Sequence, residues 1–330
     1  MINSQPDISI IVPAYNEQEV LPEFYKAICQ HRNAWNGTSE LVFVNDGSSD
    51  NTSQILNQFA DADETVRVIH LSRNFGHQPA LSAGMAAARG KAIVMMDADM
   101  QDPPEVIQDL ILKWKAGFEV VYAIRESREG NAILNFGYRT FYYWMNKSSS
   151  IYIPMHTGDF GLIDRKVVDI ILYEFPEKNR FLRGLRAFTG FNQTGVNYAR
   201  PKRASGNSKY GFRKLLALAL DGWFGFSNKP LRLATYLGIL FAVPSFLIGI
   251  LYILNKLFGI TIFTYPSTDQ PGVATLTVAV FFIGGIMLII LGIIGEYISR
   301  IYEEIKGRPT YIVREEYSVL TKAKRITTVK

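Results

Sequence analysis

The sequence predicts an α/β domain followed by two membrane-spanning helices. Over the first 125 residues, short apolar runs alternate with helix-like segments, which is typical of parallel strands joined by right-handed crossovers. Further along, no charged residue occurs from 233 to 254 or from 273 to 295, and each stretch exceeds the roughly 20 residues needed to cross a bilayer. A buried core helix is the alternative for each stretch, but such helices are usually shorter and keep a polar face.

The apolar runs and the segments between them define the expected elements. Strands are expected at residues 8–12, 41–45, 66–71, 92–96 and 119–124. Helices are expected at residues 19–31, 52–62, 79–88 and 105–116. A last short strand is expected at residues 310–314, where the chain could return to the first domain.

Bulk properties narrow the class of protein. The chain has 330 residues and a formal net charge of +5, and this length suggests about two domains. Cys29 is the only cysteine, which excludes an intrachain disulfide and a cysteine-based metal site and suits a reducing compartment. The four histidines are scattered and show no zinc spacing.

An acidic motif follows the strand expected at residues 92–96. One residue separates Asp97 from Asp99, and three residues separate Asp99 from Pro103 and Pro104. In open α/β sheets, ligands bind at the carboxyl ends of the strands, and carboxylates there suit Mg²⁺ or Mn²⁺ that holds substrate phosphates. The alternative is a polar turn in which Asp97 or Asp102 caps the next helix.

Two other strands also end in polar residues. Tyr15 and Glu17 follow the first strand, and Asp46 follows the second. An aromatic ring with acids beside it suits a base and ribose, so the three strand ends together indicate a nucleotide diphosphate. Taken alone, the segment at residues 45–48 reads as a turn and helix cap. Neither a Gly-x-Gly-x-x-Gly fingerprint nor a Walker A sequence occurs.

A basic segment precedes the first predicted span. Residues 178–220 contain no acid and ten basic residues, namely Lys178, Arg180, Arg183, Arg186, Arg200, Lys202, Arg203, Lys209, Arg213 and Lys214. A solvated basic face is one reading, and nucleic acid is disfavoured because stacking aromatics are not interleaved with the charges. Anionic headgroups attract such segments, and residues 211–226 read as an amphipathic helix in the interface.

The charges that flank the two apolar stretches predict a membrane topology. Lys229 and Arg232 precede the first stretch, whereas Arg300 and Lys306 follow the second, and no signal peptide is seen before the first strand. By the positive-inside rule we expect a multi-pass protein of the plasma (inner) membrane, with the large domain and both termini cytoplasmic. The expected organisation is an α/β domain (1–200), interface helices (201–230), a first span (231–257), an external loop (258–272), a second span (273–298) and a cytoplasmic strand with a basic tail (299–330).

Several motifs give the chain a family resemblance. The segments at residues 11–17, 44–48 and 97–105 resemble the family-2 inverting glycosyltransferases of GT-A fold, whose catalytic domain has a Rossmann-like mixed sheet. The segments at residues 73–78, 157–160, 179–184 and 208–210 resemble the polyprenyl-phosphate branch of that family. This branch includes dolichyl-phosphate mannose synthases and bactoprenol glucosyltransferases, and two C-terminal spans fit the bactoprenol type best.

The resemblance implies roles for particular residues. It implies that the nucleotide is contacted by Pro13, Tyr15, Glu17, Val44 and Asp46, and that the ribose and diphosphate are contacted by Asp97, Ala98 and Asp99. It also implies a metal ion (Mg²⁺ or Mn²⁺) on Asp99 and Gln101, and a catalytic role for Asp159 alongside Asp99. Contacts with donor or acceptor phosphates are implied for Arg125, Arg203 and Lys209. The implied donor is a UDP-sugar, and the resemblance to the bactoprenol type favours UDP-glucose. The implied acceptor is a polyprenyl phosphate.

Asp159 matches the position usually proposed as the base of the family. A phosphate monoester has a second pKa of about 6, so the acceptor is already mostly a dianion at neutral pH and needs no base. We therefore expect Asp159 to orient the acceptor or a metal-bound group, and an acid in a strand-end turn is the alternative. Gly161 stands where the family often has arginine, which removes one phosphate contact.

Other functions are weighed against this one. GDP-mannose is the alternative donor. A processive polysaccharide synthase would carry Gln-x-x-Arg-Trp, but none of the four tryptophans follows an arginine. A non-catalytic membrane scaffold is disfavoured by the intact Asp97, Asp99 and Gln101. Small residues in the apolar stretches favour a homo-oligomer, and no nucleic-acid partner is expected.

Overall fold

The computed structural model describes residues 5–126 except Asn36, residues 157–199 except 176 and 179, scattered positions between 231 and 258, and residues 272–319. Two compact units are present. The first comprises Met1–Gly225 with Arg308–Lys330, and the second comprises Phe226–Gly307.

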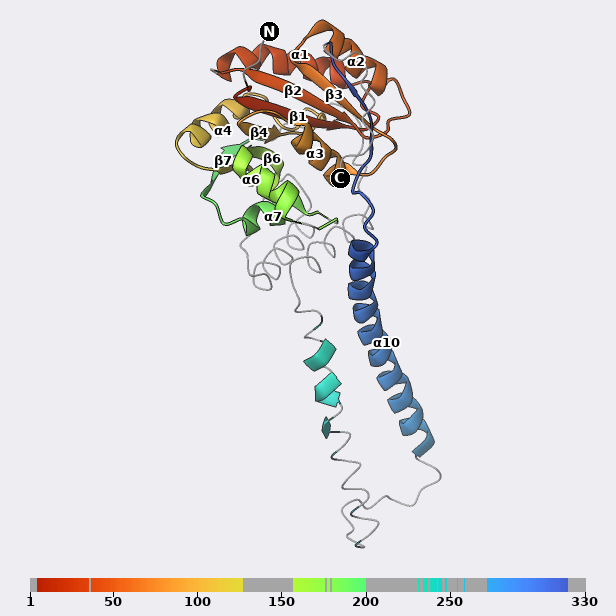
Figure 1. Cartoon of the computed structure of the whole chain (residues 1–330). Helices are drawn as coiled ribbons and strands as arrows, with labels where there is room; N and C mark the ends of the chain where they lie inside the picture. Colours follow the sequence, from red (N-terminus) through yellow and green to blue (C-terminus); the bar gives the residue numbers. More distant parts are fainter. Residues whose placement is uncertain are drawn as a thin grey trace. The chain divides into compact units, whose positions relative to one another are not determined.

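An eight-stranded mixed sheet forms the centre of the first unit (Figure 1). Its strand order is β7-β5-β6-β4-β1-β2-β3-β8. The strands are β1 (Ile8–Ala14), β2 (Ser39–Asn45), β3 (Val66–Leu71), β4 (Ala92–Met95), β5 (Val120–Arg125), β6 (Thr157–Asp164), β7 (Gln193–Tyr198) and β8 (Val313–Tyr317). The first four strands are mutually parallel, whereas β6 runs antiparallel to β4 and β5. Strands β1 to β4 are almost entirely buried, which explains why they read as continuous apolar runs.

Helices cover both faces of the sheet. They are α1 (Leu21–Arg32), α2 (Thr52–Ala62), α3 (His77–Ala87), α4 (Val106–Lys115), α6 (Arg165–Asp169) and α7 (Leu182–Phe188), with one-turn segments η1 (Asn33–Trp35) and η2 (Ile170–Glu174). The main core cluster packs α1, α2 and α4 against one face, and α3 lies on the other (Figure 1). All five strands and all four helices expected before residue 126 are present, with ends shifted by at most two residues.

Helix α3 begins at His77, two residues before the expected start. Gly76 has φ +104° and ends the preceding loop, and Pro79 fits the first helical turn because its missing N–H has no partner to lose there. A Cβ atom at Gly84 would overlap the side chain of Ile11. The absence of that atom lets α3 lie close against β1.

The second unit contains α10 (Gly272–Ile305), a helix of 34 residues and about 51 Å. Its segment Phe282–Ile305 is long and apolar enough to cross a membrane, and none of its most apolar window is buried. A helix that is apolar all round yet exposed lacks the protein core that a soluble helix would have, so this segment is a candidate span.

The described residues contain this one candidate span instead of the two that the sequence predicts. The first predicted span, 231–257, falls mostly outside the described residues, although the positions that are described there are helical. One of them, Phe241, contacts Phe282 of α10 edge to face, with ring centroids 5.6 Å apart. The predicted interface helices (201–230), the external loop up to residue 271 and the tail from residue 320 also lie outside the described residues.

Strand β8 returns the chain to the sheet of the first unit. It pairs antiparallel with β3, with Val68 opposite Tyr317 and Leu71 opposite Val313. The strand expected at residues 310–314 is therefore present, three residues further along the chain.

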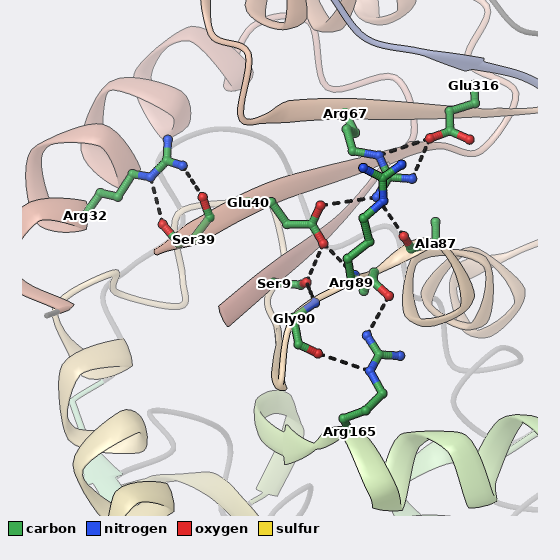
Figure 2. Close-up of polar contacts among 11 residues, drawn as sticks. Ser9, Arg32, Ser39, Glu40, Arg67, Ala87, Arg89, Gly90, Arg165 and Glu316 are labelled. Carbon is green, nitrogen blue, oxygen red and sulfur yellow. Dashed lines mark hydrogen bonds and ion pairs between the residues drawn. The ribbon is translucent and has the colours of Figure 1, made fainter. Parts of the chain in front are cut away.

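A polar network holds β8 at the end of the sheet where β1 and β2 begin (Figure 2). The Arg67 guanidinium on β3 donates to Oε2 of Glu40 at 3.2 Å, to Oε1 of Glu316 on β8 and to the carbonyl oxygen of Ala87 at 2.7 Å. Glu40 also accepts from the Ser9 hydroxyl at 2.6 Å. Because Ala87 ends α3, the same arginine ties β8, the sheet and α3 together.

Candidate active site

Four chain segments meet at one edge of the sheet. Ala14 at the end of β1 lies opposite Asn45 at the end of β2, and Ile11 lies opposite Met95 at the end of β4. Strand β6 runs the other way, with Gly161 opposite Met95, so its first residues reach the same edge. The three polar strand ends predicted from the sequence are therefore neighbours, and Asp159 joins them.

The loops after β1 and β2 are hydrogen-bonded to each other. Asn16, at φ +54°, donates its N–H to the Ser48 hydroxyl at 3.0 Å and accepts from the Ser49 N–H at 2.9 Å. The N–H of Glu17 donates to the Thr52 hydroxyl at 3.0 Å. These bonds hold Glu17 and Tyr15 next to the β2 loop, with the Tyr15 side chain 41% exposed. An exposed ring fixed beside a strand end suits stacking on a base.

Asp46 is buried, and its carboxylate accepts hydrogen bonds from the backbone. Its two carboxylate oxygens accept the N–H groups of Phe75 at 2.7 Å and Gly76 at 2.9 Å. Burial raises the pKa of Asp46, and these two donors offset part of that shift. Asp46 thus fixes the loop that leads into α3. Its contact with a nucleotide stays a prediction, and such a contact would use the remaining lone pairs of the carboxylate oxygens. Residues 45–48 form the turn that is the alternative interpretation of this segment, because Oδ1 of Asn45 accepts the Ser48 N–H.

The acidic motif forms a tight turn. Met100 has φ +60°, and Oδ1 of Asp99 accepts the Gln101 N–H at 3.1 Å. Asp102 points inward, where it accepts the Tyr198 hydroxyl at 3.0 Å and the Asp97 N–H at 3.3 Å. Burial, reinforced by the charge of Asp97, raises the pKa of Asp102 to about 7. The helix-cap alternative is wrong, because α4 begins at Val106 without a side-chain cap.

The exposed part of the turn fits a divalent cation. In the described part of the chain, no group of three or more acidic, histidine or cysteine side chains converges to form a complete metal cage. Mg²⁺ and similar ions need only one or two carboxylates when phosphates and water supply the other ligands. Asp99 and the partly exposed Asp97 provide hard oxygen donors of this kind, and Gln101 adds an amide oxygen.

Asp159 is buried and surrounded by donors. Arg183 holds it through two bonds, Nε to Oδ1 at 2.9 Å and Nη2 to Oδ2 at 3.0 Å. Gln78 donates to Oδ2 at 3.1 Å, and Nε2 of His77 lies 3.3 Å from the same oxygen. Burial alone would raise the pKa of Asp159, but Arg183 and His77 hold it well below its usual range. A carboxylate stabilised in this way is a weak base.

His77 lies between two carboxylates of the site. Its Nε2 is 3.3 Å from Asp159 and 3.7 Å from Oδ1 of Asp97. Burial opposes protonation, but the two carboxylates outweigh it and raise the pKa of His77 to about 9. The imidazole is therefore a cation at neutral pH and links the acid turn to Asp159.

Arg125 is the one predicted phosphate ligand within the described residues. Its Nε donates to the Tyr198 hydroxyl at 3.2 Å, and a Cβ atom added to Gly158 would lie 2.9 Å from its Nη2. Arg125 therefore stands beside the start of β6, at the edge where Asp97 and Asp99 lie. Arg203 and Lys209 lie outside the described residues.

Three residues of this site have no assigned role in the sequence reading, namely His77, Gln78 and Arg183. All three stand within motifs that carry the family resemblance, at residues 73–78 and 179–184. Their convergence on Asp159 could not be predicted from the sequence, because Gln78 lies 81 residues from Asp159 along the chain.

Fold and site together define an α/β domain with a polar, acid-containing site at the carboxyl ends of its parallel strands. The family model described as glycosyl transferase family 2 matches residues 9–172. The uncharacterized glycosyltransferase YkcC of Bacillus subtilis (strain 168) is 46% identical over 317 residues, which cover 95% of each chain. The chain belongs to glycosyl transferase family 2, and it is a glycosyltransferase.

Other relatives agree with the branch that the motifs indicate. The bactoprenol glucosyl transferase of Shigella phage SfV is 42% identical over 311 residues, covering 94% of this chain and 98% of that protein. Among solved structures, glucosyl-3-phosphoglycerate synthase from Mycobacterium tuberculosis with Mn²⁺, UDP-glucose and phosphoglyceric acid is 18% identical, with a TM-score of 0.44 over 65% of this chain and 76% of that chain. A similarity of that size does not extend to the bound ligands.

Proposed function

We propose that the protein transfers one glucose from UDP-glucose to a polyprenyl phosphate at the cytoplasmic face of the membrane, with inversion and with the help of Mg²⁺ or Mn²⁺. The observation that carries this proposal is the partly exposed pair Asp97 and Asp99 at the strand edge, beside a strongly hydrogen-bonded Asp159. The sugar and the lipid acceptor are supported by relatives named bactoprenol glucosyl transferase.

The donor would lie along the ends of β1, β2 and β4. Tyr15 and Glu17 would face the nucleoside, and Arg125 would approach the diphosphate. Asp99, with Gln101 and Asp97, would hold the metal ion, and the ion would neutralise charge on the departing diphosphate. Stabilising this leaving group matters most because transfer passes through an oxocarbenium-like state.

Asp159 acts in this proposal without accepting a proton. The phosphate dianion is already a nucleophile near neutral pH. A buried carboxylate with a lowered pKa, held by Arg183 and Gln78, is suited to fixing those cationic and polar groups where the acceptor arrives.

The path of the chain supports a two-span anchor. The first unit supplies both the strand before the membrane unit, β7, and the strand after it, β8, in one sheet. Both ends of residues 226–307 must therefore leave and re-enter on the same side of a membrane, which requires an even number of crossings. If α10 crosses once, a second crossing is needed within residues 226–271.

Incorporation of labelled sugar into lipid tests the proposal. Membranes that contain the protein are offered labelled UDP-glucose, GDP-mannose or UDP-N-acetylglucosamine with undecaprenyl phosphate and Mg²⁺ or Mn²⁺. We expect label in the lipid phase from UDP-glucose alone, and its loss with a chelator. Label from GDP-mannose alone would establish the alternative donor, and no label from any donor would refute glycosyl transfer to this lipid.

A further inference from the structure

Helix α7 presents two arginines to the start of β6. Arg183 and Arg186 are three residues apart, so they share one face of the helix. Arg183 is neutralised by its two bonds to Asp159. Arg186 lies on the next turn and has no such partner among the described residues, although it is the more deeply buried of the two.

The surroundings of Arg186 leave most of its hydrogen-bonding capacity unused. It is 3% exposed, and its guanidinium has five N–H donors. Among the described residues, its guanidinium makes one long bond, from Nη2 to the Gly158 carbonyl oxygen at 3.5 Å, and lies 5.7 Å from the centre of the Tyr122 ring. No carboxylate of the described residues comes within ion-pair distance of it, and burial lowers its pKa to about 10.

Gly161 lies beside both the β5 backbone and this arginine. A Cβ atom on Gly161 would lie 2.6 Å from the Val121 carbonyl oxygen and 3.5 Å from Nη1 of Arg186. Because Gly161 and Asp159 are two residues apart on β6, they face the same side of the sheet. The guanidinium of Arg186 therefore lies on the face of β6 that carries Asp159.

A buried charge without a counterion destabilises the protein that contains it. Around Asp159, the guanidinium groups of Arg183 and Arg186 face one carboxylate among the described residues. The excess positive charge and the unused donors suit a doubly charged anion that arrives beside Gly158. Arginine is well matched to phosphate because its planar fork donates two parallel bonds.

We propose that Arg186 and the Asp159-bound Arg183 form the subsite that takes the phosphate group of the acceptor. This inference rests on the proposed function and adds to it the residues that bind the acceptor. In it, Arg186 donates to the phosphate, and Asp159 keeps Arg183 in position beside it.

Kinetics with the full-length protein test the subsite. For Arg186→Gln we expect the KM for undecaprenyl phosphate to rise at least about tenfold, while the KM for UDP-glucose changes less than about twofold. Arg186→Lys keeps the charge without the planar fork and should give an intermediate KM. Lys113→Gln removes one exposed positive charge from α4 and serves as the matched control, with both KM values unchanged. An unchanged lipid KM in Arg186→Gln, or an equal rise in both KM values, would overturn the assignment.

Stability measurements separate a ligand site from a structural arginine. Arg186 has no ion-pair partner among the described residues, so replacing it with an apolar side chain of similar length should not destabilise the free protein. We expect Arg186→Met to melt at or above the wild-type temperature and to lose the stabilisation that inorganic phosphate gives the wild type. A lower melting temperature with the phosphate response intact would show that Arg186 is structural.

The two readouts also separate this inference from the proposed function. Phosphate stabilisation requires no turnover, so its loss in Arg186→Met would support the subsite even if no lipid product formed. Normal transfer by the wild type, together with an unchanged lipid KM in Arg186→Gln, would remove the subsite and leave the proposed function standing.

Discussion

At the scale of single residues, Asp159 shows how partners decide what a carboxylate can do. Arg183, Gln78 and His77 all bond to it, and its pKa is held well below the usual range. Each of these partners stabilises the charged form, so protonation would break several bonds at once. The arrangement favours a positioning role over proton transfer.

Replacing Asp159 with asparagine tests this role. The buried guanidinium of Arg183 would lose its counterion, so we expect Asp159→Asn to destabilise the protein by about 3 kcal/mol along with the loss of activity. A thermal melt followed by intrinsic fluorescence measures the first effect. Asp109→Asn, an exposed acid on α4, is the control and should melt like the wild type. A variant that melts normally but has lost transfer would point to a base.

At the scale of elements, His70 joins β3 to β2 and α2. Its Nε2 lies 2.9 Å from Oδ1 of Asn57, and its Nδ1 lies 3.0 Å from Nδ2 of Asn45. Because Oδ1 of Asn45 already accepts from Ser48, its amide nitrogen faces the histidine and donates. This leaves the proton of the neutral ring on Nε2, where it bonds to Asn57.

The histidine makes stability depend on pH. Burial, helped by Arg314, lowers the pKa of His70 from 6.5 to about 4. The unfolded chain therefore binds a proton below pH 6.5 that the folded chain does not bind until about pH 4. Stability from this group is present above pH 6.5 and falls by up to about 3 kcal/mol as the pH drops through that window. His70→Gln should flatten this part of a plot of melting temperature against pH, and an unchanged slope would contradict the argument.

Strand β8 depends on the ion pair between Arg67 and Glu316. Glu316→Gln would weaken charge-assisted bonds in a buried network, so we expect a loss of about 2 kcal/mol and earlier proteolysis after residue 307. Glu315→Gln is the matched control on the same strand, because alternate residues of a strand face opposite sides. Equal melting temperatures and equal cleavage rates for the two variants would show that the pair does not hold β8.

The elements that could be predicted from sequence are those with a strong local pattern. Strands β1 to β4 are apolar along their length, and α2 spans the residues that its pattern predicts. Strand β6 contains Gly158, Asp159 and Gly161, whose polar and small side chains hide it from such a pattern. Its antiparallel direction brings Asp159 to the acidic edge, and this pairing across the sheet is a tertiary property.

At the scale of the whole molecule, the chain leaves one folded unit, passes through an apolar unit and returns to the same sheet. Strand β8 can pair with β3 only if residues 308–317 lie on the same side of the membrane as β3. The excess of basic residues on both flanks of the apolar unit agrees with a cytoplasmic position. If α10 crosses a membrane, we expect from this connectivity a second crossing within residues 226–271, independently of hydropathy.

Cysteine labelling in intact cells tests this topology. With Cys29 replaced by serine, Ser267→Cys places the only thiol between the two apolar stretches, and Asp109→Cys places it on α4 of the catalytic unit. A membrane-impermeant maleimide should label Ser267→Cys from outside, and it should label Asp109→Cys only after the cells are opened. Labelling must be compared in variants that retain sugar transfer, because a misfolded protein could expose either thiol. Protection of both thiols in intact cells, followed by labelling of both in opened cells, would show that residues 226–307 lie on the membrane without crossing it.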